Sequence, residues 1–124
     1  MAARIERARS PRLRWFAFGP GNDLTVVSFS HGLIESMRAA RFLAENKFLD
    51  AEIIDLRSLN PLDWDTIEKS IRKTGRLLVV DEDHRHCSLA GEILARAAES
   101  DIPLKSRVRR ITLPFTTTPG TSPA

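Results

Sequence analysis

The sequence predicts a doubly wound α/β domain, with a largely parallel β-sheet between two layers of helices. Two observations lead to this fold class. Apolar runs of strand length alternate three times with segments whose apolar residues recur every three or four positions. The chain of 124 residues is also long enough for one hydrophobic core and too short for two ordinary domains. Strand–helix alternation implies parallel pairing through right-handed crossovers, which places helices on both faces of the sheet.

The first predicted elements lie near the amino terminus. Residues 13–18, LRWFAF, form a short aromatic run that suits an edge strand. Residues 24–30, LTVVSFS, form a β-branched apolar run that suits a strand buried on both faces. A helix is expected to follow, with Ser30 as its N-cap. The apolar stripe of this helix comprises Leu33, Met37, Ala40 and Ala44.

The next elements repeat the alternation. Residues 51–56 and 76–80 are apolar runs of strand length. Between them, Asp63 is expected to cap a helix, and Gly75 is expected to end that helix in the left-handed conformation. The inner face of this helix comprises Trp64, Ile67 and Ile71.

The remaining elements are one helix and one strand. Residues 88–100 are expected to form a helix that Ser88 caps. Residues 107–113, RVRRITL, alternate in polarity, which is typical of a half-exposed edge strand. The residues that follow are rich in proline and threonine and predict no regular element.

The positive charge of the chain is concentrated at its amino terminus. Residues 1–14 carry five arginines and one acid, so the other residues share a net charge of −1 within a total of +3. A nucleic-acid interface would need this charge on the folded body, so no nucleic-acid partner is expected. We expect residues 1–12 to be a disordered basic lead-in and residues 13–124 to form the domain.

The same features bear on the compartment. No apolar run approaches the roughly 20 residues of a membrane helix, and the first residues lack the apolar centre of a signal peptide. The single cysteine excludes an internal disulfide. We therefore expect a cytoplasmic protein without a membrane partner.

Residues 81–92, DEDHRHCSLAGE, gather side chains that metal sites and thiol enzymes use. His84 and His86 lie two positions apart and would share one face of an extended segment, where a neighbouring acid or Cys87 could complete a metal site. Alternatively, Cys87 beside His86, just before a helix, suits a reactive thiol. Both interpretations stay open at this point.

A structural interpretation accounts for most of this stretch and is favoured. The acids would lie where a buried strand reaches water, with Ser88 capping the next helix and Glu92 in its first turn. Strand alternation places Asp81 and Glu82 on opposite faces, so one of the two acids is expected to point inward. We therefore expect no catalytic residue and no metal ligand in this chain.

Residues 28–32, SFSHG, are the best-placed candidate for ligand binding. They join the carboxyl end of a strand to the start of a helix, which is where ligands bind in open α/β sheets. Ser30, His31 and the backbone of Gly32 would hold an anion, with Glu82 and His84 lining the same crevice. This pattern favours an alternative function, a regulatory module that binds a nucleotide or another anion.

Several stretches together resemble a known family. They are GNDLTVVSFS, DLRSLNPLDWDTI, KTGRLLVVDED and CSLAGEILARAAE, followed by RRITLPFTTTPGTSPA, and they cover about residues 21–124. This set resembles the transketolase C-terminal domain family, and in particular the beta subunit of the thiamine-diphosphate-dependent decarboxylase component of 2-oxo acid (pyruvate or acetoin) dehydrogenase complexes. The most specific parts are DLRSLNPLDWDTI and KTGRLLVVDE.

The resemblance implies a three-layer αβα, Rossmann-like fold with a mixed, mostly parallel five-stranded sheet whose first strand is antiparallel. It also implies a mainly architectural role, as either a separated fragment or a free-standing relative of the beta subunit. The full family enzyme uses thiamine diphosphate and Mg²⁺. This chain has neither the glycine–aspartate–glycine metal motif nor the glutamate that activates the cofactor, so it is expected to bind neither group alone.

The partners implied by the resemblance are other subunits. They are a second copy of the chain in a homodimer, alpha and beta subunits, and the peripheral subunit-binding domain of the acyltransferase core. A eukaryotic member would lie in the mitochondrial matrix. The residues expected at such interfaces are exposed aromatic and charged side chains: Trp15, Phe16, Asp83, Arg85 and Phe115.

Overall fold

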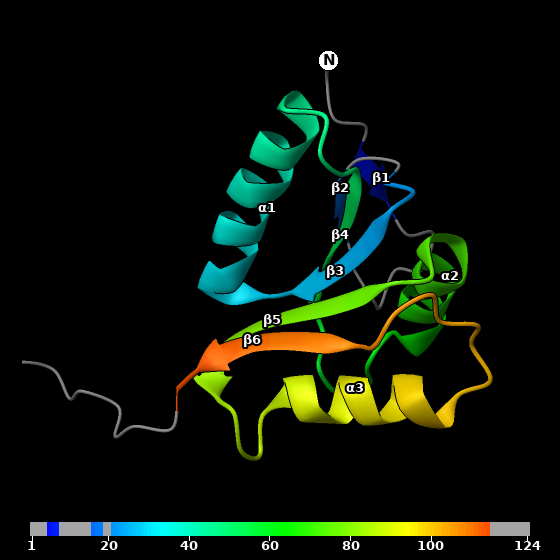
Figure 1. Cartoon of the computed structure of the whole chain (residues 1–124). Coiled ribbons are helices and arrows are strands. Elements are labelled where there is room, and N and C mark those ends of the chain that lie inside the picture. The colour runs from blue at the N-terminus through cyan, green and yellow to red at the C-terminus, as the bar shows by residue number, and fades with distance from the viewer. Residues whose placement is uncertain (1–4, 8–15, 19–20, 115–124) are drawn as a thin grey trace, which may run out of the picture.

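A computed structural model describes residues 5–7, 16–18 and 21–114 of the chain (Figure 1). Within these residues, six strands form a single sheet in the order β1-β2-β4-β3-β5-β6. The strands are β1 (Ile5–Arg7), β2 (Phe16–Phe18), β3 (Leu24–Ser28), β4 (Ala51–Asp55), β5 (Leu77–His84) and β6 (Arg109–Leu113). The helices are α1 (Ser30–Glu45), α2 (Trp64–Thr74) and α3 (Leu89–Glu99). Among the described helices, none combines the length and the apolar composition needed to cross a membrane.

Four strands of the sheet are parallel and two are antiparallel. Strands β4, β3, β5 and β6 pair in parallel, which confirms the predicted α/β class. Strand β2 pairs antiparallel with β4 and lies within the stretch expected to form the first strand. That stretch is not at the edge, because β1 pairs with the other side of β2.

The additional strand β1 is a departure from the sequence expectation. It raises the number of strands in the described sheet to six, one more than the expected five. It also lies inside residues 1–12, which were expected to lack regular structure. Strand β1 has only three residues, two of them charged, and shows no hydrophobic alternation. The sequence pattern therefore does not predict it.

The helices lie on both faces of the parallel strands, as the alternation predicts (Figure 1). Helix α1 covers one face, while α2 and α3 cover the other. Successive residues of the central strand therefore enter different cores: Val26 packs in the cluster beneath α1, and Val27 packs in the cluster beneath α2 and α3. Both valines are buried, which explains why β3 is apolar without interruption.

Both predicted ends of α2 are confirmed. The side chain of Asp63 accepts a hydrogen bond from the backbone N–H of Thr66, and Gly75 ends the helix with a φ of 73°. Ile67 and Ile71 of its inner face are completely buried. The Gly75 N–H donates to the carbonyl oxygen of Ile71, which satisfies one carbonyl group of the last turn.

A buried set of hydroxyl groups joins α2 to the sheet. The Oγ1 of Thr25 in β3 lies 2.7 Å from the Oγ of Ser70 and 2.8 Å from the Oγ1 of Thr74. Ser70 also donates to Glu52 of β4, and Glu52 forms an ion pair with Lys73 at 2.7 Å. Because each polar group has a partner, burial here costs little and fixes the position of α2 along the strands.

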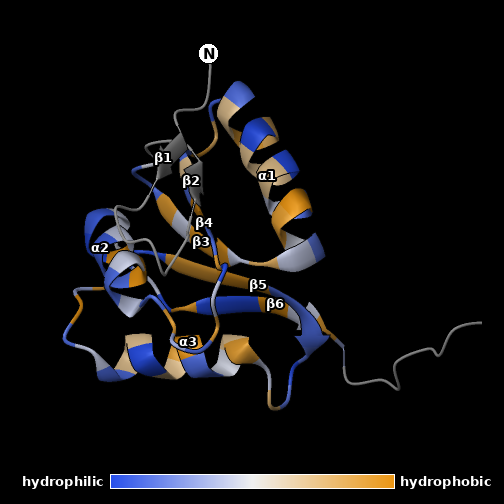
Figure 2. Ribbon diagram, turned by 180° about the vertical axis from the view of Figure 1, so that it is seen from behind, coloured by the Kyte–Doolittle hydropathy of each residue, from blue (hydrophilic) through white to orange (hydrophobic). Residues whose placement is uncertain are grey.

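Strand β5 has eight residues and is longer than the five-residue strands β3, β4 and β6, and both β5 and β6 are more exposed than β3 and β4. Strand β5 continues four residues beyond the predicted 76–80, because its ladder with β6 resumes at His84 after an irregularity. Strand β6 alternates between exposed and half-buried residues, which confirms the prediction of a half-exposed strand. Figure 2 shows hydrophilic residues along much of β6 beside the largely hydrophobic β5.

The N-cap of α2 gives a first test of this fold. Replacing Asp63 by alanine removes the acceptor for the Thr66 N–H and lowers the free energy of unfolding by about 1 kcal/mol, measured by urea denaturation. The matched control is Asp65→Ala, which removes a carboxylate from the same helical turn. Equal losses in the two variants would show that charge, and not the capping hydrogen bond, stabilises this end.

Candidate functional site

The carboxyl ends of three adjacent parallel strands carry a row of buried polar residues. Ser28 ends β3 and lies opposite Asp55, which ends β4. On the other side, Ser28 lies opposite Val80, one residue before Asp81. Ser28, Asp55 and Asp81 are all at most 3% exposed. Ligand crevices of open α/β sheets lie at this edge, so this row is the first place to look for a site.

Asp81 is engaged entirely by backbone groups. One carboxylate oxygen accepts from the N–H of Asp83 at 2.9 Å, and the other accepts from the N–H of Ala90 at 3.1 Å. The Ala90 N–H belongs to the first turn of α3, where a carboxylate is favourable for the helix dipole. Asp81 is thus the inward-pointing acid of the Asp81–Glu82 pair, and it joins the end of β5 to α3.

The predicted capping role of Ser88 is wrong in one respect. Ser88 does occupy the N-cap position with extended backbone, but its side chain makes no capping hydrogen bond. Its Oγ is buried without a hydrogen-bond partner among the described residues. The reason is tertiary, because Asp81 comes from β5 to accept the N–H group at the start of α3.

The other members of the row are also engaged within the domain. The hydroxyl of Ser28 donates to the carbonyl oxygen of Val80 at 2.9 Å, which ties β3 to β5. The carboxylate of Asp55 forms an ion pair with Arg57 in the following loop. A pair of carboxylates poised for acid–base chemistry would need an open position beside them. The partners observed here are those of a structural row.

The predicted anion site is partly assembled. The backbone N–H of His31, at the start of α1, donates to Oε1 of Glu82 at 3.3 Å across 51 positions of sequence. Gly32 is buried, and a Cβ atom there would lie 3.0 Å from the Oγ of Ser28. The structure therefore brings His31, Gly32 and Glu82 together, and the anion at the helix start is the chain's own carboxylate.

Two further members of that prediction lie differently. The N-cap of α1 is Phe29, and Ser30 is already the first helical residue, so the predicted N-cap is wrong. Ser30 has a φ of 55°, a left-handed conformation that is uncommon for serine. His84 is half-buried at the end of β5, where its N–H donates to the carboxylate of Asp83.

The remaining chemistry of this loop does not form a metal centre. Across the residues that the structure describes, there is no group of three or more histidine, cysteine or acidic side chains placed to hold a metal ion. Cys87 is exposed, with a φ of 58°, at the turn that leads into α3. Left-handed residues thus precede or begin both helices at this edge, at Ser30 and Cys87.

Comparison with known proteins decides the family. Residues 18–124 match the family model described as the C-terminal domain of transketolase. The chain belongs to the transketolase C-terminal domain family. The match covers all four parallel strands and all three helices, including the edge of the sheet described above.

Relatives of this transketolase C-terminal domain include subunits of two dehydrogenases. The acetoin:2,6-dichlorophenolindophenol oxidoreductase subunit beta of Bacillus subtilis is 39% identical over 100 residues, which are 80% of this chain and 29% of the relative. The corresponding subunit of Cupriavidus necator is 38% identical over the same shares. The pyruvate dehydrogenase E1 component subunit beta of Staphylococcus epidermidis is 36% identical over 82% of this chain and 31% of its own length.

A solved structure supports the fold of this domain. A chain titled "Split gene transketolase, inactive beta4 tetramer" aligns with a TM-score of 0.73 and 21% identity, over 87% of this chain and 34% of that chain. At this identity the alignment shows the fold alone. The chain thus spans about three-tenths of the length of the beta subunits it matches and about a third of the solved chain.

The interface residues predicted for this family domain fall in two groups. Asp83 and Arg85 are both exposed at the rim formed by the end of β5. Phe16 lies in β2, whereas Trp15 and Phe115 lie outside the described residues.

Sequence reasoning missed an exposed apolar surface on and after α1. Ile34, Phe42 and Phe48 are 46%, 60% and 71% exposed. Of the predicted apolar stripe of this helix, Leu33, Met37 and Ala40 pack inward, whereas Ala44 is exposed and its predicted place in the core is wrong. The sequence does contain a signal for this surface, because Ile34 and Phe42 are apolar residues of the same helix that lie outside the predicted stripe. A helix that is apolar on more than one side exposes apolar area unless another element or protein covers it.

The two neighbouring acids at the end of β5 give a matched test. Asp81→Ala leaves two backbone N–H groups without their acceptor and lowers the free energy of unfolding by about 2–4 kcal/mol. Glu82→Ala, the control, removes one exposed contact at the start of α1 and costs about 1 kcal/mol or less. Chemical denaturation measures both, and a larger loss in Glu82→Ala would contradict the assignment of Asp81 as the structural acid.

Proposed function

We propose that this chain is a non-catalytic assembly and docking domain of the beta subunit of a thiamine-diphosphate-dependent 2-oxo acid or acetoin dehydrogenase. The supporting observation is the combination of an engaged sheet edge and an unengaged helix surface. The carboxylates of Asp55 and Asp81 bind groups of the chain itself, whereas the side chains of Phe42 and Phe48 are exposed. Exposed apolar side chains of this size are typical of surfaces that another protein covers.

The cofactor expectation forms part of the proposal. Mg²⁺ in such enzymes would require free carboxylate oxygens in octahedral geometry, and thiamine diphosphate would be anchored through that metal. The oxygens of Asp81 accept backbone N–H groups, and Asp55 faces Arg57, so these residues do not fit the metal. We therefore propose that the rest of the beta subunit, and not this domain, holds the cofactor.

The proposal also specifies the strands that the domain shares with its family and the cellular compartment in which it acts. The unit shared with the family would be the five strands β2 to β6, with the first of them, β2, antiparallel to its neighbour. The domain would act in the cytoplasm, or in the mitochondrial matrix of a eukaryote. One relative, from Ascaris suum, is a pyruvate dehydrogenase E1 component subunit beta described as mitochondrial, 43% identical over 82 residues.

The partners proposed are a second copy, alpha and beta subunits, and the peripheral subunit-binding domain of the acyltransferase core. The outer surface of α1 would contribute apolar area to subunit association. The exposed rim residues Asp83 and Arg85 would add charged contacts to docking, together with Trp15, Phe16 and Phe115 as aromatic candidates.

A chimeric subunit tests the assembly role. This chain replaces the matching C-terminal three-tenths of the Bacillus subtilis acetoin oxidoreductase subunit beta, and light scattering after size exclusion measures assembly with the alpha subunit. We expect a complex of the natural stoichiometry. The double change Ile34→Glu and Phe42→Glu should abolish it, because charges would be buried at the interface.

The matched control for that chimera is Lys69→Glu with Arg72→Glu, two changes to exposed charged residues of α2, on the other face of the sheet. These variants should assemble about as well as the unmodified chimera. An intact complex in the Ile34→Glu, Phe42→Glu chimera would contradict the role of this surface. A complex that forms equally well without any C-terminal domain would contradict the assembly function.

The alternative of a regulatory anion-binding module stays a prediction. It places an anion at Ser30, His31 and Gly32, where Glu82 now accepts the His31 N–H. If it is correct, 10 mM phosphate, about the concentration at which weak sites fill, raises the melting temperature of the wild type by mass action, and more in Glu82→Gln. Chloride at equal ionic strength is the control, and no phosphate effect in either chain would contradict the alternative.

A further inference from the structure

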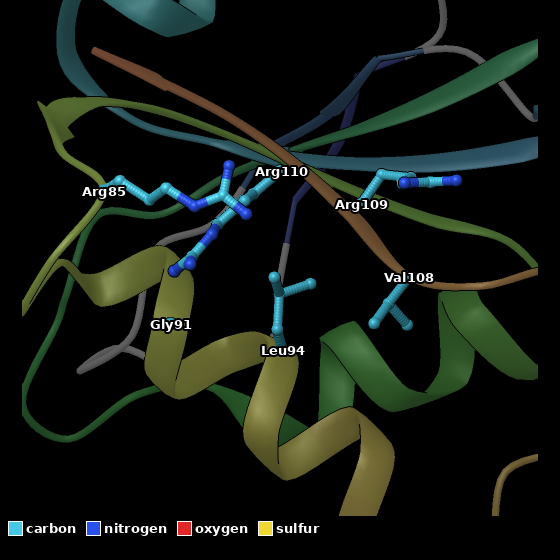
Figure 3. A pocket seen from close by; sticks show the side chains of 6 residues that line it. All are labelled: Arg85, Gly91, Leu94, Val108, Arg109 and Arg110. Carbon is cyan, nitrogen blue, oxygen red and sulfur yellow. The ribbon is translucent and has the colours of Figure 1, made fainter. Parts of the chain in front are cut away.

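A second surface of the domain carries three arginine side chains. A hollow of about 360 Å³ lies between α3 and β6, lined by Arg85, Gly91, Leu94, Val108, Arg109 and Arg110 (Figure 3). Three parts of the fold contribute to it: the turn after β5, helix α3, and residues 108–110 at the start of β6. Within the described part of the chain, none of the three arginines has an ion-pair partner.

The charges of this surface are arranged by the alternation of β6. In the parallel register, Arg110 lies opposite Val79 and Arg109 lies opposite Leu78, so the two arginines project to opposite faces of the sheet. Arg110 extends toward α3, where Arg85 also reaches, whereas Arg109 points away from them (Figure 3). Two neighbouring strand positions thus present one guanidinium group on each face.

Gly91 makes room for this arrangement on the α3 side. A Cβ atom at position 91 would lie 3.3 Å from Nη1 of Arg110, so the guanidinium group rests close to the helix backbone. Leu94 and Val108 provide an apolar floor beside it. The arginine is therefore held over a shaped surface and does not simply extend into water.

The free edge of the sheet lies along the same surface. Strand β6 is last in the strand order, so its outer backbone groups have no strand partner among the described residues. Ile111 and Leu113, on the same face as Arg109, are 56% and 40% exposed. An edge strand that combines free backbone groups with exposed apolar side chains is suited to accept one more strand.

We propose that this surface binds an extended segment of a partner protein that adds to β6 and carries two adjacent acidic residues flanked by β-branched apolar residues. One acid would lie on the side of Arg85 and Arg110, and its neighbour on the side of Arg109, because successive side chains of a strand alternate. The flanking apolar residues would cover Ile111 and Leu113. This inference shares Arg85 with the docking role proposed above but otherwise rests on different residues, those of α3 and β6.

A single small anion fits the surface less well than such a segment. Arg85 and Arg109 are exposed, and exposed ion pairs bind weakly one at a time. A small anion would leave the backbone edge of β6 and the exposed Ile111 and Leu113 uncovered. An extended segment engages the charges, the edge and the apolar side chains together, and their contributions combine in one affinity.

Edge protection is the competing explanation for these arginines. Charged side chains on an edge strand often prevent unwanted pairing. That role would require charge alone, with no hollow, no contribution from Arg85 and no space at Gly91. The convergence of three elements on one hollow favours recognition of a partner instead.

Fluorescence anisotropy with the full chain tests this proposal. The probe is a labelled ten-residue peptide in which two adjacent glutamates are flanked by alternating valine and threonine, measured at 50 mM salt. Arg85→Gln with Arg110→Gln should weaken binding about tenfold through loss of two charge contacts. Gly91→Leu should also weaken it, because the leucine displaces Arg110 without changing the charge. Arg41→Gln with Arg38→Gln, on α1, is the control with the same loss of charge and should bind like the wild type.

Changes to the peptide separate the possible modes of binding. Glutamine in place of both glutamates should weaken binding through loss of charge, and alternate N-methylated residues should weaken it through loss of the strand hydrogen bonds. Binding that is insensitive to N-methylation, or equal in the wild type and Arg85→Gln, Arg110→Gln, would overturn the proposal. Absence of binding at 50 mM salt, or tighter binding of a single-stranded RNA of the same length, would overturn it as well. Thermal melts confirm that each variant is folded.

Discussion

The rest of the structure depends on the position of β3 between two parallel neighbours. Because the chain leaves β3 toward β4 and later returns to pair β5 on the other side, right-handed crossovers must place α1 and α2 on opposite faces. The central strand is then buried on both sides, and Val26 and Val27 each begin a separate hydrophobic cluster. The hydroxyl contacts of Thr25 with Ser70 and Thr74 fix α2 against the same strand.

The alternation of side chains along β5 determines the face of the sheet to which each acid at its end points. Asp81 follows Val79 onto the face of α2 and α3, where its carboxylate meets the start of α3. Glu82 follows Val80 onto the face of α1, where its carboxylate meets the N–H of His31. Two neighbouring carboxylates thus stabilise two different helices. Through these two contacts, the residues at the end of β5 join this strand to the starts of α1 and α3.

The proposed function follows from how the polar and apolar groups are distributed. The carboxylates of Asp55 and Asp81 at the sheet edge are bound to groups of the domain itself, while large apolar and charged side chains are exposed on other surfaces. Phe42 and Phe48 lie at one surface, and Arg85 and Arg110 lie at another. Families that share a fold place different functions on its surfaces, so these surfaces, and not the sheet, carry the functional argument.

The sequence by itself determined the α/β class, the positions of the predicted strands and helices, the cap at Asp63 and the left-handed end at Gly75. These features depend on residues within a few positions of one another, and hydrophobic periodicity and capping report such local preferences. The tertiary structure alone decided which groups meet across the chain: Glu82 with His31, Asp81 with Ala90, and Arg85 with Arg110 beside one hollow. It also added β1, whose three residues are stabilised by pairing with β2 and not by any pattern of their own. These long-range contacts depend on the strand order and the register of the sheet, which local sequence preferences do not determine.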